Sequence, residues 1–581
     1  MAAGSIPGAR LWALGLGAAC GALALSARGG FSLLAALIHV VRPGDPLSAT
    51  FIERLCEAQF MAGLLGLLLL PVLGVGDRPL RWAGEQIRKP STPVFLAGLF
   101  VACTLAAWAV QEFLFDGIPH VTDAVSHLFQ AKILASGALT VPHPPCPDAF
   151  DHEHIVMTCD GRWFTKYTPG HPLLLAAGVL TGLLSWVVPL ASGACAVFLV
   201  LLLEPWVGRA PSRAAGVLFV SSPLALLLGG SFMSHTTFLA LVLAGGAGLC
   251  RVLRERHGPL RRGLAAATGL AWGWGLICRP QDAAIAGLLA VLVIVGSGRW
   301  GAAWRRLPWL AAGLVGPLAI LMLWNRALYG TALAIGYGFT ETGFRQPMFQ
   351  ASFGLSDQFP LSKAIEISIW TAFRFNGAFL GWPVSMAAVP FALAAREHRR
   401  LVGWSLVSVV LVVGVYFFYS YYGAEYEARY YFPLLPPLLA LTVLGLRRLA
   451  HTQLGAALAT WGILLGTSYS ALYYIPRDLV PRYRGAYEQV SREAWRAADS
   501  GIDGRAVVLM PNAYGVRLEY AAGFQFNDPW LRGRILFARD LPEWHACLAR
   551  AFPDRSLWRL VDEDGRWRVI PLAKTAPQSG R

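Results

Sequence analysis

The chain has 581 residues, of which 55% are hydrophobic and 14% charged, and it contains 21 tryptophans. With a mean hydropathy of +0.50, this composition excludes a soluble protein and indicates a polytopic membrane protein with room for about a dozen helices of roughly 20 residues. The net charge of +15 does not indicate nucleic-acid binding, because the arginines form short clusters between apolar runs. The positive-inside rule explains that placement better.

The apolar runs are the candidate membrane spans. They cover residues 11–40, 58–76, 93–115, 170–190, 193–207, 214–230, 235–253, 262–278, 281–296, 307–325, 377–395, 401–419, 430–447 and 454–474. If the basic linkers between them face the cytoplasm, the loops at 116–169 and 326–376 and the C-terminal tail lie outside. We therefore expect N-terminal helices in 1–92, a membrane domain in 93–474 and an external domain in 475–581.

One stretch does not fit this topology. Four runs between 170 and 253 separate the outer loop from the cytoplasmic arginines that begin at Arg251, and an even number of crossings cannot change sides. One run must therefore be re-entrant or merged with a neighbour, which leaves about thirteen spans. The linker with Arg209 and Arg213 favours 193–230 as the irregular region.

The last hundred residues differ in character. From about Pro476 the apolar runs stop, and the strand-like segments RAVVLM and GRILFAR, a helix-like LPEWHACLARAF and an Asp-Gly hairpin signal follow. This pattern predicts a small α/β domain outside the membrane.

The loop at 116–171 is unusually polar for its surroundings. On a helix that starts at Asp123, the side chains of Asp123, Ser126, His127 and Gln130 share one side, while the other side is largely apolar. We expect a short helix at the interface, with its apolar side in lipid or protein and its polar side toward a cavity. Asp123 is then a candidate general base. The alternative is a residue of the first helical turn, where the helix dipole favours a negative charge.

The same loop holds candidate metal ligands. They are His120, Asp123, His127, His143, Asp151, His152, Glu153 and His154. Nitrogen and oxygen ligands suit a divalent ion such as zinc or manganese, but the spacing matches no sharp motif, so solvated histidines are the alternative. Cys146 and Cys159 lie in this loop and can form a disulfide in an oxidising compartment.

Cations also lie at the predicted outer ends of the spans. Lys166, Arg279 and Arg429 are placed to meet a phosphate at headgroup depth, and arginine offers a bidentate fork. Snorkelling to the interface is the alternative for these residues. His235 opens a later span and either lines the cavity or is an ordinary interfacial histidine. The tyrosines between Tyr416 and Tyr431 fit an aromatic belt, with sugar stacking open for one or two of them.

Several motifs together resemble GT-C superfamily glycosyltransferases. They are Asp123-Ala-Val-Ser-His127, Lys166-Tyr167-Thr168-Pro169-Gly170, Cys278-Arg279-Pro280, Asn325-Arg326-Ala-Leu-Tyr-Gly330 and Glu427-Ala-Arg429-Tyr430-Tyr-Phe-Pro433. The likeness is to the bacterial branch related to protein O-mannosyltransferases and lipid A aminoarabinose transferases, and it covers roughly 93–450. This chain departs from the commoner pattern by having Ala124 where a second acid follows the first and Thr168 where a proline is usual.

The resemblance implies an all-α polytopic fold of GT-C type and a hexosyl- or pentosyltransferase. Such an enzyme transfers a sugar from a polyprenyl-phosphate donor to an acceptor at the outer face of the bacterial cytoplasmic membrane, usually with inversion. Asp123 takes the role of the essential acid. The expected substrate-binding residues are His127, Gln130, Lys166, Tyr167, His235, Arg279, Arg429 and Tyr430.

Two other classes of function are the alternatives. A transporter or lipid flippase typically carries charges in mid-span and has related halves with broken helices. Here the charges cluster at span ends and no repeat is visible. A non-catalytic membrane scaffold is the third hypothesis.

Overall fold

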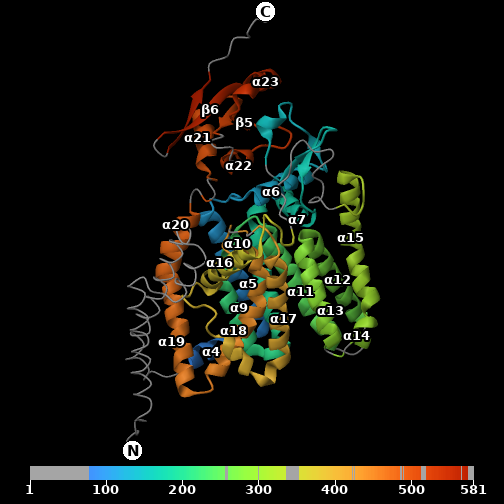
Figure 1. The fold of residues 1–581 in the computed structure, drawn as a ribbon, viewed down its shortest axis with the longest axis vertical. Helices are drawn as coiled ribbons and strands as arrows, with labels where there is room; N and C mark the ends of the chain where they lie inside the picture. The colour runs from blue at the N-terminus through green and yellow to red at the C-terminus, as the bar shows by residue number, and fades with distance from the viewer. Residues whose placement is uncertain are drawn as a thin grey trace, which may run out of the picture.

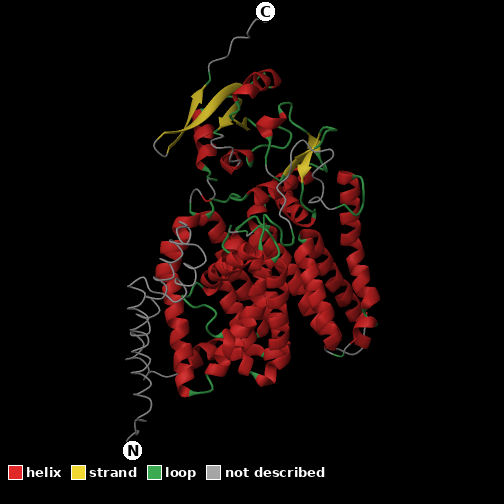
Figure 2. Ribbon diagram, viewed as in Figure 1, coloured by secondary structure: helices red, strands yellow, loops and turns green. Residues whose placement is uncertain are grey.

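The computed structural model describes residues 78–572, except 153, 255–258, 297, 299, 335–352, 422, 424, 485–486, 488–489, 512–517 and 564–565. The runs expected at 11–40 and 58–76, and with them most of the N-terminal helices, lie outside the described residues. The described part is a long helical body with the strands gathered at one end (Figures 1 and 2).

Most of the chain is helical. The α-helices are α4 (Arg78–Arg88), α5 (Thr92–Ala109), α6 (Thr122–Ala135), α7 (Gly170–Thr181), α8 (Val187–Val207), α9 (Arg209–Val220), α10 (Pro223–Gly230), α11 (Ser234–Arg254), α12 (Pro259–Cys278), α13 (Pro280–Gly296), α14 (Trp300–Trp304), α15 (Leu307–Tyr329), α16 (Leu361–Leu380), α17 (Arg399–Phe417), α18 (Leu435–Leu449), α19 (Gln453–Tyr469), α20 (Val480–Tyr483), α21 (Glu493–Gly501), α22 (Leu518–Phe524) and α23 (His545–Ala551). Two π-helical segments are η2 (Val110–Leu114) and η9 (Ser470–Leu479). The 3-10 helices are η3 (Pro147–Phe150), η4 (Leu184–Trp186), η6 (Val389–Ala394), η7 (Arg396–His398), η8 (Arg429–Leu434) and η12 (Pro542–Trp544).

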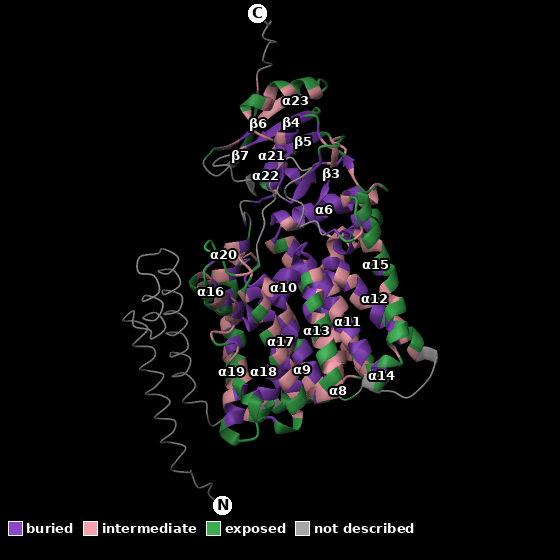
Figure 3. Ribbon diagram, turned by 45° about the vertical axis from the view of Figure 1, so that its right-hand side comes forward, coloured by how far each residue is buried: buried purple, intermediate pink, exposed green. Residues whose placement is uncertain are grey.

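Six helices among the described residues are long and apolar enough to cross a membrane, or seven if the bent pair α9 and α10 is one span. The expected number of about thirteen spans is therefore not confirmed. Burial separates outer from central helices: the apolar window of α15 is only 17% buried, whereas that of η8 with α18 is 67% buried. Figure 3 shows the same contrast, with exposed residues along α15 and buried ones at the centre of the body.

The region expected to be irregular, 193–230, contains the bent pair α9 and α10, and α7 is a short apolar helix in the same stretch of chain. Arg209, at the start of α9, donates to the carbonyl of Pro90, just before α5 begins, whereas Gly230, at the end of α10, lies against Ala107 near the end of α5. The pair is bent by 59° but runs along the length of α5. By contrast, the 12 residues of α7 reach only about 18 Å, and Gly178 lies against Val187 at the start of α8. If α7 does not cross and the bent pair is one span, three crossings remain between 170 and 253, which agrees with the expected topology.

A second difference lies at the expected span 377–395. There α16 ends at Leu380, and the six-residue 3-10 helix η6 follows only at Val389–Ala394. Gly381 has φ of 72°, the left-handed conformation that closes a helix. Pro383 comes two residues later and cannot continue the helix. α16 begins at Leu361, so most of this helix lies in the segment 326–376 that was expected to be a loop.

The strands form two sheets. In the polar loop, β1 (Val141–Pro142), β3 (Arg162–Thr165) and β2 (Ile155–Met157) form an antiparallel sheet in that order. In the C-terminal region, the order is β5 (Ile535–Arg539), β4 (Ala506–Met510), β6 (Ser556–Glu563) and β7 (Arg566–Pro571). β4 is parallel to both neighbours, and β6 pairs antiparallel with β7, as the Asp-Gly signal predicts.

The C-terminal α/β domain packs on α6. Val125, Phe129 and Ile133 of α6 belong to the same buried cluster as the residues of β4 and β5. The apolar side of α6 is therefore buried in protein. Lys132 of α6 also donates to the carbonyls of Gln525 (2.6 Å) and Asn527 (3.1 Å).

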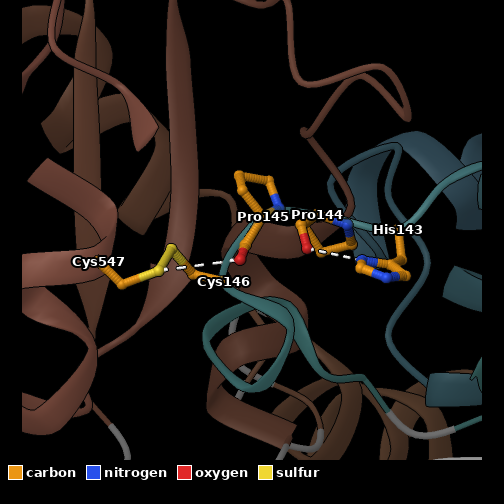
Figure 4. Close-up of a disulfide and its surroundings, with 5 residues drawn as sticks. All are labelled: His143, Pro144, Pro145, Cys146 and Cys547. Carbon is orange, nitrogen blue, oxygen red and sulfur yellow. Dashed lines mark hydrogen bonds between the residues drawn. A yellow bond between two sulfur atoms is a disulfide. The ribbon is translucent and has the colours of Figure 1, made fainter. Parts of the chain in front are cut away.

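A disulfide fixes this contact covalently. Cys146 of the polar loop is joined to Cys547 of α23, with their Cα atoms 6.1 Å apart (Figure 4). The expected pairing of Cys146 with Cys159 is wrong, because Cys159 is a free, exposed thiol. Spacing in the sequence favoured the nearer partner, whereas the true partner lies 401 residues away.

Candidate active site

Asp123 lies in the first turn of α6, at the junction of the helical body and the polar loop. Its carboxylate accepts a hydrogen bond from the Tyr167 hydroxyl. Arg429 Nη1 lies 3.6 Å from Oδ2, and His154 Nε2 lies 3.9 Å from the same oxygen. The side chain keeps 20% of its surface exposed, while that of Arg429 keeps 2%. Asp123 therefore occupies the first helical turn, where the helix dipole favours its charge, and its role as a general base stays a prediction.

The electrostatics keep Asp123 ionised. Burial by itself raises the pKa of its carboxyl, but the guanidinium of Arg429, the Tyr167 hydrogen bond and Lys166 more than offset this, so the pKa lies well below its ordinary range. The pKa of His154 is also lowered, but for a histidine this favours the uncharged form. Burial, reinforced by the charge of Lys166, lowers the pKa of its imidazole well below the ordinary value, so His154 is neutral near pH 7.

Arg429 begins η8 and meets two carboxylates. Its Nη2 lies 3.2 Å from Glu425 Oε2 and 3.4 Å from the hydroxyl of Tyr430, and its Nη1 faces Asp123. Within the described part of the chain, Nε and Nη1 are buried without a hydrogen-bond partner. Two donors of this fork are thus available to a ligand.

The loop before η8 is held by a buried carboxylate, Glu427. Its oxygens contact Arg374 Nε of α16 (3.3 Å), Arg482 of α20 and the Tyr483 hydroxyl (2.9 Å). Tyr426 and Glu427 both have positive φ, 54° and 65°, which costs about 1–3 kcal/mol for each such residue and persists only where the surroundings fix it. These contacts place Arg429 against Asp123.

Arg279 lies between α12 and α13, on the other side of the site. Its Nε pairs with Asp282, and its Nη1 lies 3.4 Å from the Ser234 hydroxyl at the start of α11. Tyr416 of α17 donates to Asp282 at 2.6 Å, and its ring stacks on Tyr430 with 5.1 Å between centroids. Arg279 and Asp282 are three residues apart at a helix start, and this spacing in the sequence is typical of such an ion pair.

Lys166, Tyr167 and His127 complete the wall next to Asp123. The Lys166 ammonium lies 5.4 Å from the centre of the Tyr167 ring. The His127 ring lies between the rings of Tyr167 and His171, with 4.4 Å and 5.0 Å between centroids. Tyr167 thus orients the carboxylate and is itself packed between a cation and an imidazole. Of the expected substrate-binding residues, all but Gln130 gather around this centre.

Gln130 has a structural role instead. Its amide donates to the carbonyl of Leu139 (2.9 Å) and accepts from the backbone N–H of Thr165 (3.0 Å), and the residue is fully buried. Ser126, on the same side of α6, bonds the carbonyl of His154 at 2.9 Å. The polar side of α6 is therefore shared: its first turn supplies Asp123, and the next turns tie the helix to the β1–β3–β2 sheet.

The expected metal ligands do not converge. No group of three or more His, Cys, Asp or Glu side chains within the described ranges is arranged to hold a metal ion, and Glu153 lies outside those ranges. Both ring nitrogens of His120 contact backbone carbonyls, and Asp151 faces Arg539 of the C-terminal domain at 3.6 Å. The histidines of this loop mostly serve its packing.

An apolar groove leads away from the site. It lies between α8, α11, α13, α17 and α18, and begins at Asp282, next to Arg279. Leu401 and Val412 of α17 both line it, so it extends about 17 Å along that helix. Its lining is almost wholly apolar, with Phe238 near the site and Trp404 near the far end.

Known proteins resemble this chain in structure rather than in sequence. No protein-family model and no curated protein matches the sequence. Two structures of ArnT from Cupriavidus metallidurans, one bound to undecaprenyl phosphate and one in the apo state, match with a TM-score of 0.50 and 13% identity; both matches cover 83% of this chain, and they cover 99% and 98% of the ArnT chains. An oligosaccharyltransferase from Archaeoglobus fulgidus, tethered with an acceptor peptide, is more distant, with a TM-score of 0.42 and 11% identity over 80% of this chain and 69% of that one. The chain therefore shares the fold of ArnT, a GT-C fold, as its motifs predicted.

Proposed function

We propose that this protein transfers a sugar from a polyprenyl-phosphate donor to an acceptor at the outer face of the cytoplasmic membrane. The observation that carries the proposal is the placement of the Asp123 carboxylate 3.6 Å from the buried fork of Arg429. The site thus holds a carboxylate that can act as a base and a cation that can bind a phosphate, and displacement of a polyprenyl phosphate uses both kinds of group. ArnT, which shares the fold, binds undecaprenyl phosphate.

The reaction follows from these positions. Asp123 accepts the proton of an acceptor hydroxyl, whose oxygen forms a bond to the anomeric carbon. The bond from that carbon to the phosphate oxygen breaks, and the electron pair leaves with the polyprenyl phosphate. Arg429, Arg279 and Lys166 stabilise the negative charge that develops there.

Donor binding also adjusts the base. Arg429 lowers the pKa of the Asp123 carboxyl, which makes this carboxylate a weak proton acceptor. A phosphate that docks on Arg429 brings negative charge close to Asp123 and offsets that cation. The basicity of Asp123 therefore rises when the donor is in place, when it is needed.

The groove accounts for the lipid part of the donor. It begins beside Arg279 and runs along α17 between apolar side chains. A polyprenyl chain in this groove would place its phosphate at the Arg279 end. Burial of its apolar surface would then supply binding energy away from the reacting atoms.

Two features support the outer face. The Cys146–Cys547 disulfide joins the polar loop to the C-terminal domain, and disulfides persist in oxidising compartments such as the periplasm. The basic linkers lie at the opposite ends of the helices, for example Arg251 near the end of α11 and Arg399 at the start of α17. Positive linkers favour the cytoplasmic side.

The test uses the full-length protein in nanodiscs with undecaprenyl-phosphate-linked hexoses and pentoses, and an envelope extract as the source of acceptor. Release of undecaprenyl phosphate and appearance of a glycosylated product are measured. Asp123→Asn should lower the rate by about 10²–10⁴-fold, the usual contribution of a general base. Asp160→Asn is the matched control, because Asp160 is an exposed acid of the same loop that pairs only with Arg162 and Thr158 among the described residues. Normal transfer by Asp123→Asn would remove this residue from the mechanism. Movement of the lipid across the bilayer of proteoliposomes, without a covalent product, would favour a flippase.

A further inference from the structure

His235 is a buried histidine whose ring makes no hydrogen bond to the residues that the structure describes. It is the second residue of α11 and keeps only 2% of its surface exposed. In the part of the chain that the structure describes, neither of its ring nitrogens has a hydrogen-bond partner. A buried polar atom left unpaired costs about 1–3 kcal/mol, so two such atoms on one ring indicate a ligand that completes them.

The surroundings of His235 are those of the candidate active site. Its ring lies 6.2 Å from that of Tyr430, and the preceding residue, Ser234, contacts Arg279 at 3.4 Å. The charges that act on the ring are those of Arg279, Arg429 and Asp123. His235 therefore borders the space between the phosphate-binding cations and the base, where the transferred group must lie.

The chemistry of the ring selects the kind of ligand. A neutral imidazole offers one N–H donor and one acceptor nitrogen. Phosphate oxygens at neutral pH mainly accept, which suits the guanidinium forks and leaves the acceptor nitrogen unsatisfied. A sugar hydroxyl both donates and accepts, and adjacent hydroxyls can satisfy both nitrogens.

We propose that His235 binds hydroxyl groups of the transferred sugar and so determines which glycosylated donors the enzyme accepts. This inference rests on the proposed function, because it assigns a role within that site. His235 is a specificity-determining residue here, whereas Arg279 and Arg429 hold the phosphate that all donors share.

His171 provides a matched control. It is also buried and lies on the neighbouring helix α7, but its Nδ1 contacts the Thr237 hydroxyl (3.1 Å) and its Nε2 contacts the carbonyl of Phe232 (2.9 Å). Both nitrogens are satisfied within the protein. Replacement of His171 should therefore lower stability, whereas replacement of His235 should change ligand binding.

The experiment compares ligands with and without the sugar. Undecaprenyl phosphate and undecaprenyl-phosphate-linked mannose, glucose, galactose and arabinose are titrated into full-length wild-type protein, His235→Phe, His235→Gln and His171→Phe in nanodiscs. For His235→Phe, the affinity for undecaprenyl phosphate should stay within about twofold of wild type. The affinity for the preferred glycosylated donor should fall about tenfold, as loss of one or two hydrogen bonds predicts, and the preference among the sugars should flatten. His235→Gln, which keeps a donor and an acceptor, should restore part of the preference.

Each other outcome has a definite meaning. Equal loss of affinity for undecaprenyl phosphate and its glycosides in His235→Phe would assign His235 to the phosphate and overturn the proposal. Unchanged affinity and unchanged sugar preference would also overturn it, while leaving the proposed function in place. If the wild-type protein neither binds nor transfers from any glycosylated donor, the proposed function fails and this inference fails with it. Thermal unfolding of each variant checks folding, and a fall is expected for His171→Phe.

Discussion

Replacing Arg429 by glutamine removes a cation that lies 3.6 Å from the Asp123 carboxylate. Two unit charges about 4 Å apart interact by about 4 kcal/mol at the effective dielectric constant of about 20 that describes buried sites. That energy corresponds to about three pKa units. Because the Tyr167 hydrogen bond and Lys166 remain, the pKa of Asp123 should rise by up to this amount.

The pH dependence of kcat/KM reports this change, since it follows the ionisation of the free enzyme. A carboxylate base is lost as the pH falls through its pKa. In the wild type that pKa lies well below the ordinary range, so Asp123 stays ionised at mildly acidic pH. In Arg429→Gln the acidic limb of the profile should move to higher pH by up to about three units. The plateau should also fall by about 10²–10³-fold, because a phosphate-binding cation is lost.

The control for this experiment is Arg539→Gln. Arg539 Nη1 also lies 3.6 Å from a buried carboxylate, that of Asp151, but at the contact between the polar loop and the C-terminal domain. Its replacement should lower the thermal stability and leave the acidic limb in place. If the limb lies at the same pH in Arg429→Gln as in the wild type, the reasoning that Arg429 controls the base is refuted.

Two predictions concern the contact between α6 and the C-terminal domain. Cys547→Ser should lower the free energy of unfolding by about 2–5 kcal/mol, measured as a fall in the thermal midpoint, whereas Cys159→Ser, which removes an exposed free thiol, should leave the midpoint unchanged. Burial lowers the pKa of the Lys132 ammonium to about 8, while the unfolded chain keeps a value of about 10.4. Between these values the unfolded state binds more protons, so stability should rise with pH from about 8 to 10 as the cost of the buried charge is relieved. In Lys132→Met this rise should be absent, and an unchanged slope would contradict the assignment.

The sequence predicted the parts of the fold that depend on local pattern. Long apolar helices such as α5, α11 and α17 appear within a few residues of the expected runs, because hydropathy and basic flanks determine them. The run at 377–395 misled the prediction because apolar composition alone does not reveal a helix end at Gly381. Parity of the crossings predicts one irregular run between 170 and 253, and only contacts between helices distinguish α7 from the bent pair of α9 and α10 as the candidate.

The candidate site divides in a similar way. The sequence allowed the prediction of Asp123, Arg279 and Arg429, because charged residues at the ends of apolar runs are rare and easily recognised. The helical wheel grouped Gln130 with Asp123, yet it does not tell which residues of one side meet a ligand and which meet neighbouring backbone. The role of Glu427 and the pairing of Cys146 with Cys547 depend on segments far apart in the sequence. No local pattern encodes such contacts.

The disulfide between Cys146 and Cys547 also constrains how the protein is made. The two cysteines are 401 residues apart, so Cys146 leaves the ribosome long before its partner exists. Until then the Cys146 thiol must stay free or be released from any temporary partner, such as Cys159 thirteen residues away. The bond can close only when the C-terminal domain and the polar loop lie on the same side of the membrane. Its formation therefore marks a chain whose insertion is complete, and a chain that stops or inverts midway cannot acquire it.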